Sequence, residues 1–61
     1  MNESRQQLFA LNRKFFEMVE SFNVESLAAA NGNKSADRRC RKITLEIEKL
    51  GKEWRKASLG L

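Results

Sequence analysis

The sequence predicts an all-α protein that folds as a single domain, an antiparallel two-helix hairpin of the coiled-coil type. The 61-residue chain has no Pro, and in both halves its apolar residues recur at alternating spacings of three and four. Between the halves, the stretch Asn31-Gly32-Asn33 interrupts the pattern. Alternating spacings of three and four place apolar side chains on one face of a helix, whereas a strand would need a period of two.

The first helix is predicted over residues 4–30. Ser4 with Gln7 three residues later fits a capping box, and Asn2 is a competing cap. The apolar seam of this helix is formed by Leu8, Leu11, Phe15, Met18 and Phe22.

The turn is predicted at residues 31–33 and the second helix over residues 34–58. Gly32 can take the left-handed conformation that ends a helix, and Asn33 or Ser35 can cap the next one. Asp37 stands in the first turn, where the helix dipole favours an acid. The second seam consists of Ala36, Cys40, Ile43, Ile47, Leu50, Trp54, Ala57 and Leu61.

Folding about the turn brings the two seams into one register. The exception to the apolar pairing is Glu25, which falls opposite Cys40 near the turn. The expected pairs are Phe22 with Ile43, Met18 with Ile47, Phe15 with Leu50, Leu11 with Trp54 and Leu8 with Ala57.

Further apolar residues lie beside the first seam rather than on it. Phe9, Phe16 and Val19 would be exposed in a two-helix hairpin. The matching flank of the second helix is small, with Thr44, Gly51 and Ser58 at seven-residue spacing. A Gly in the middle of a helix destabilises it by roughly 1 kcal/mol relative to Ala. Close approach of another backbone would explain why Gly51 stands there. We therefore expect a homodimer that packs two hairpins into a four-helix bundle through Phe9, Phe16, Val19, Thr44 and Gly51. The alternative is that the phenylalanines only widen the stripe between the two helices of one chain.

The composition argues against catalysis and against a cofactor. The chain has no His, and its single Cys40 can form neither an internal disulfide nor a cysteine cluster around a metal. No Gly-rich phosphate loop is present, and the polar N-terminus is not a secretory signal. We expect a cytoplasmic, non-catalytic protein with no metal, no cofactor, no membrane partner and no small-molecule substrate.

Positive charge is concentrated in the second half of the chain. The whole chain has a net charge of +4, divided into −1 over residues 1–31 and +5 over residues 32–61. At 1.5 Å per residue, the basic side chains from Arg38 to Lys56 extend for about 27 Å on the side away from the seam. We predict that the nucleic-acid-binding residues are Lys34, Arg38, Arg39, Arg41, Lys42, Lys49, Lys52, Arg55 and Lys56.

This basic face has three interpretations from charge alone. It can bind nucleic acid, it can be a solvated face in which Glu46, Glu48 and Glu53 balance the cations, or it can bind an anionic membrane. No aromatic residue interrupts the basic face, which disfavours base stacking on single strands. Two long helices also leave no room for a helix-turn-helix, so we expect contacts to backbone phosphates with little sequence discrimination.

The second half resembles the bacterial linker-histone-like family, the chlamydial histone-like proteins and their short bacterial relatives. The resemblance rests on Gly32-Asn33-Lys34-Ser35-Ala36, Arg39, Arg41-Lys42, Leu45-Glu46, Glu48-Lys49, Lys52-Glu53-Trp54-Arg55-Lys56 and Ser58. It covers residues 31–59 and implies non-specific DNA binding in the nucleoid without enzymatic activity. The basic residues that it carries over are Lys34, Arg39, Arg41, Lys42, Lys49, Lys52, Arg55 and Lys56.

Our leading hypothesis is a dimeric, histone-like nucleoid protein that binds duplex DNA without sequence preference. One alternative is a helical-hairpin dimer that binds structured RNA. Another is an adaptor module that recruits a partner protein through the apolar stripe of Phe9 and Phe16.

Overall fold

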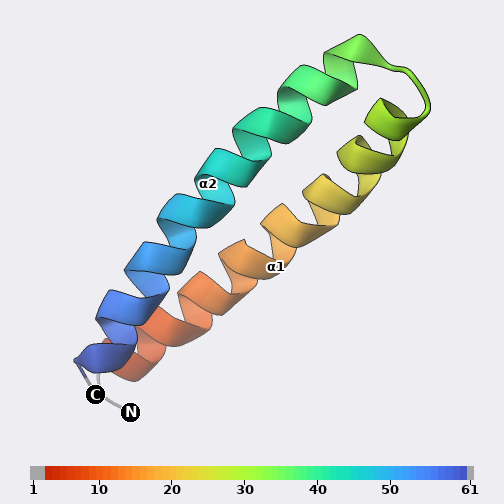
Figure 1. Cartoon of the computed structure of the whole chain (residues 1–61). Helices are drawn as coiled ribbons and strands as arrows, with labels where there is room; N and C mark the ends of the chain where they lie inside the picture. The colour runs from red at the N-terminus through yellow and green to blue at the C-terminus, as the bar shows by residue number, and fades with distance from the viewer. Residues whose placement is uncertain (1–2, 61) are drawn as a thin grey trace.

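The protein is a two-helix hairpin, as the sequence predicts. The computed structural model describes residues 3–60, which form α1 (Glu3–Ala30) and α2 (Lys34–Leu59) and contain no strand. The helices run antiparallel side by side, and a short turn joins them at one end (Figure 1). Each helix extends one residue further at the open end than the spacing predicts. The proposed cap at Asn2 and the side chain of Ser4 lie outside the described parts of the chain.

The turn ends α1 and starts α2 through backbone and side-chain hydrogen bonds. Gly32 has a φ of 99°, and its N–H donates to the carbonyl of Ala29 (3.0 Å). The N–H of Asn33 donates to the carbonyl of Ala28 (3.1 Å), which completes a Schellman-type helix end. The Asn33 side chain then accepts from the N–H of Ala36 (3.0 Å), so Asn33 rather than Ser35 caps α2.

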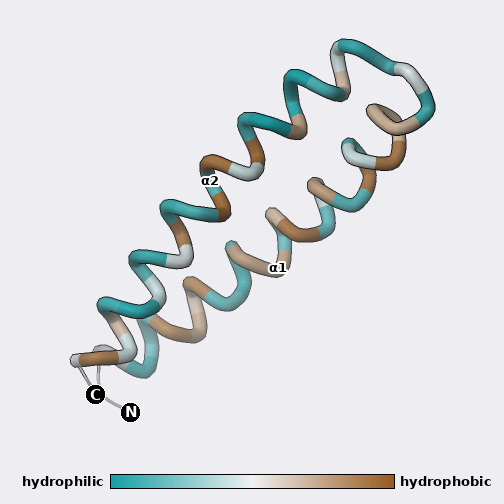
Figure 2. The backbone as a smooth tube through the Cα atoms, viewed as in Figure 1, coloured by the Kyte–Doolittle hydropathy of each residue, from teal (hydrophilic) through white to brown (hydrophobic). Residues whose placement is uncertain are grey.

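The predicted seams are the faces that the helices turn toward each other. Every described seam residue is at least half-buried, and Ala36 is the one fully buried residue among those described. Hydrophilic stretches follow the outer side of α2 (Figure 2). The indole N–H of Trp54 donates to the Asn12 side chain (2.7 Å), one residue from the predicted partner Leu11, so the register agrees with the prediction.

The hairpin is long and thin, with a large surface for its mass. Its extents are 45 × 16 × 11 Å, and its radius of gyration is 14.0 Å, against about 10.5 Å for a compact chain of this length. The accessible surface is 5055 Å². A folded monomer of 7.1 kDa would expose about 4,100 Å². The chain alone therefore leaves roughly 1,000 Å² more surface in water than a typical folded protein of its size.

Candidate nucleic-acid interface

The basic residues of α2 form an exposed face along the helix. All nine residues predicted to bind nucleic acid are exposed. Because successive residues turn by 100°, most of them lie on the side of α2 opposite the seam, where α1 does not cover them. We call this surface the basic face, and its central members are Lys34, Arg38, Arg41, Lys42, Lys49, Lys52 and Lys56.

Arg39 and Arg55 are separated from the centre of the basic face. Arg39 lines a shallow groove between the helices together with Glu20 and Glu25. Arg55 lines a different groove with Phe16 and Gly51. The two arginines therefore lie on opposite flanks of α2. Their spacing of 16 residues already indicates this, because a helix that turns 100° per residue places such residues on nearly opposite sides.

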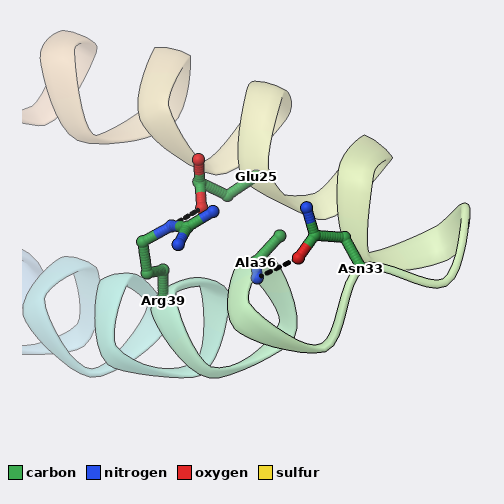
Figure 3. A network of polar contacts seen from close by, with 4 residues as sticks. All are labelled: Glu25, Asn33, Ala36 and Arg39. Atoms are coloured by element: carbon green, nitrogen blue, oxygen red, sulfur yellow. Dashed lines mark hydrogen bonds and ion pairs between the residues drawn. The ribbon is translucent and has the colours of Figure 1, made fainter.

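Two of the predicted cations are paired with carboxylates of the same chain. Arg39 donates from Nε to the Glu25 carboxylate across the two helices (Figure 3). Arg41 donates to Asp37 one turn earlier in α2 (2.7 Å). Sequence reasoning found Glu25 as a polar residue in the seam but did not find its partner. These pairs reduce the charge that Arg39 and Arg41 present to an anion.

The aromatic residues beside the α1 seam are exposed. Phe9 is 64 % exposed and Phe16 70 %, so they do not belong to the packing between α1 and α2. This exposure disfavours the alternative that they only widen the stripe within one chain. Phe16 and half-buried Gly51 line the same groove, which shows that the flanks of α1 and α2 lie on one side of the hairpin. We call this side the phenylalanine face, and its members are Phe9, Phe16, Val19, Thr44 and Gly51.

Other kinds of site find little support in the described part of the chain. Over residues 3–60, neither helix is long and apolar enough to cross a membrane. Among the described side chains, no three of the types His, Cys, Asp and Glu gather as a metal site. Leu45 is exposed among the cations of the basic face, and sequence reasoning gave it no role. A single exposed apolar side chain is common on protein surfaces.

Comparison with known families identifies the relatives of this hairpin. The family described as histone H1-like protein Hc1 matches residues 10–61. The chain belongs to this histone H1-like family. The match includes most of α1 and all of α2, so it is broader than the resemblance over residues 31–59. Neither the curated proteins nor the solved structures contain a match to the chain. Membership of the histone H1-like family indicates a histone-like protein whose partner is DNA.

Proposed function

We propose that the chain binds duplex DNA without sequence preference, through contacts between the basic face and backbone phosphates. The observation that carries this proposal is the exposed basic face on a chain of the histone H1-like family. Under this proposal the protein acts in the nucleoid as an architectural component and catalyses no reaction.

The dimensions and chemistry of the basic face suit phosphates rather than bases. Double-stranded DNA carries one negative charge per about 1.7 Å of helix axis, so a face about 27 Å long can meet several phosphates. Five of the seven central members of the basic face are lysines, whose flexible point charges suit phosphate oxygens. Trp54 is half-buried in the seam and donates to Asn12, so it is not available on the basic face for stacking on a base.

The phenylalanine face supports a homodimer as the binding unit. A stable interface buries about 800 Å² on each partner, close to the surface that this chain exposes in excess of a typical monomer. Aromatic side chains contribute most to such interfaces because they bury large areas. Two chains would carry a net charge of +8, twice the +4 of one chain, which strengthens binding to a polyanion.

The test is a fluorescence-anisotropy titration of duplexes of several unrelated sequences at a series of salt concentrations. We expect equal affinity for all sequences and a slope of log affinity against log salt of roughly −3 to −7. Replacing both Lys49 and Lys52 with Ala should flatten the slope by about 1.8, because two phosphate contacts are lost.

The matched control replaces Arg13 and Lys14 of α1 with Ala, which removes the same net charge away from the basic face. Equal loss in the two double variants would mean that net charge, not the basic face, drives binding. Absence of binding at low salt would refute the proposal. Preferential competition by a structured RNA would favour the RNA-binding alternative.

A further inference from the structure

The phenylalanine face can pair with a second copy in two ways. A two-fold axis parallel to the helices sets α1 of one copy against α2 of the other. A two-fold axis across the helices sets α1 against α1 and α2 against α2. We propose the first arrangement, in which the two basic faces point to opposite sides of the dimer and hold two duplexes at once. This inference rests on the proposed function, DNA binding by a dimer.

Side-chain size favours packing of α1 against α2 of the second copy. The α1 flank is bulky, with Phe9 and Phe16, whereas the α2 flank is small at Thr44 and Gly51. An added Cβ at Gly51 would meet nothing closer than the Arg55 guanidinium at 3.8 Å. The hairpin itself therefore does not need a Gly at this position, although it costs about 1 kcal/mol in mid-helix. An aromatic ring from a second copy would use the space that this Gly leaves.

The register of the hairpin brings the bulky and small residues to the same level. A two-fold axis parallel to the helices keeps every residue at its own height, so the partner's α2 stands at the same height as the chain's own α2. The Trp54–Asn12 hydrogen bond fixes that height. Four residues beyond Asn12 in α1, Phe16 faces the level of Leu50, one residue or about 1.5 Å from Gly51 of the partner subunit. The same offset sets Phe9 near the partner's Ser58 and Asn23 near the partner's Thr44.

Charge favours the same arrangement. Residues 1–31, which include α1, have a net charge of −1, and residues 32–61, which include α2, have +5. Setting α1 against α2 of the second copy keeps the two strongly positive helices on a diagonal of the bundle. Setting α2 against α2 would bring them into contact and place both basic faces on one side, where they repel each other.

The arrangement gives the dimer two separate DNA-binding surfaces. In a four-helix bundle, the two α2 helices on a diagonal expose their outer sides in opposite directions. Each basic face then lies on the side of its helix away from its own α1, so one duplex cannot contact both. The expected activity is bridging, in which one dimer joins two duplexes or two segments of one duplex.

A capture assay tests bridging directly. A duplex fixed to beads is incubated with the protein and a fluorescent second duplex, and the captured fluorescence is measured as the protein concentration rises. We expect capture to rise and then fall, because excess protein saturates each duplex with its own dimers. Phe16→Ser should abolish capture. The control Val24→Ser should retain it, because Val24 is exposed to a similar degree (65 %) but lines the groove on the other side of the hairpin.

The anisotropy titration separates the failure of this inference from that of the proposed function. If the wild-type protein binds a duplex in that titration but never captures a second one, bridging is refuted and DNA binding stands. If it binds no duplex at all, the proposed function itself fails.

Disulfide crosslinking tests which helices meet. Two chains are prepared in the Cys40→Ser background, one with Asn23→Cys and one with Thr44→Cys, which leave Phe16 and Gly51 in place, and they are mixed under mild oxidation. A disulfide needs Cα atoms within about 7 Å, so it reports direct helix contact. We expect crosslinks between the two different chains. Crosslinks of either chain mainly with itself would support the other arrangement, and no crosslink at all would refute the interface.

Discussion

Glu25 pairs with Arg39, a cation of the helix proposed to contact DNA, and removing the charge of Glu25 should strengthen DNA binding. The Glu25 side chain is only 21 % exposed, and its carboxylate accepts from Arg39, whose side chain is 56 % exposed. The substitution Glu25→Gln keeps the shape of the side chain and removes its negative charge. It raises the net charge from +4 to +5 and releases the Arg39 guanidinium for a phosphate.

The size of the effect follows from one added phosphate contact per chain. One contact steepens the slope of log affinity against log salt by about 0.9. The ratio of variant to wild-type affinity should therefore be about 3.5-fold larger at 50 mM salt than at 200 mM. An ion pair between partly exposed groups contributes about 0–1 kcal/mol to stability, so the variant should still fold. Circular dichroism checks the fold, and anisotropy at the two salt concentrations measures the effect.

Glu20→Gln is the matched control. Glu20 lines the same groove as Arg39 and its loss changes the net charge equally, but Arg39 pairs with Glu25 instead. We expect the control to strengthen binding less and to leave the slope nearly unchanged. If both variants steepen the slope equally, or if Glu25→Gln weakens binding, then the ion pair with Glu25 does not keep Arg39 from binding a phosphate.

Three further predictions concern stability. Gly32→Ala should destabilise the hairpin by about 1–2 kcal/mol, since its φ of 99° disfavours a side chain. In the Phe16→Ser background, which lacks the proposed dimer contact, Gly51→Ala should stabilise the hairpin by up to about 1 kcal/mol. Thermal unfolding measures both glycine variants, and two changes of one sign would contradict these backbone arguments. Asn12→Ala should cost about 1 kcal/mol by removing the acceptor of the Trp54 indole N–H, whereas Asn23→Ala, eleven residues further along α1 at another exposed position, should cost less. A shift of about 4–8 °C in Tm per kcal/mol is expected for a chain of this size, so equal Tm values for these two variants would refute the role of the hydrogen bond.

The fold could be predicted because the sequence encodes it through local rules. The alternating apolar spacing identifies the faces that α1 and α2 turn toward each other, and those residues are at least half-buried wherever they are described. Gly32 and Asn33 have the residue types that a helix end and a helix start require, and both have the predicted roles. Ser35 is also of a residue type that caps helices, and only the backbone conformation at the turn shows that Asn33 takes this role.

The candidate site was less predictable because it depends on where long side chains point. Charge patterning found all nine cations of α2 but not the Glu25–Arg39 pair, because two residues 14 apart in sequence meet only once the hairpin is closed. Heptad spacing separated Phe9 and Phe16 from the seam, and their exposure confirms that separation. Their assignment to a dimer interface stays a prediction.

The contacts between α1 and α2 close loops of very different length, and we expect this difference to set the order in which the hairpin folds and opens. The Arg39–Glu25 pair closes a loop of 14 residues beside fully buried Ala36, whereas the Trp54–Asn12 bond spans 42 residues toward the open end. Loop-closure entropy rises with length, so we expect the helices to close from the turn outward and to fray from their free ends. Amide hydrogen exchange should be slower around Cys40, inside α2 near the turn, than around Lys56 near the open end. A duplex bound along the basic face would slow amide exchange most near the open end. There, phosphate contacts would hold α2 in its helical form where packing between the helices is weakest.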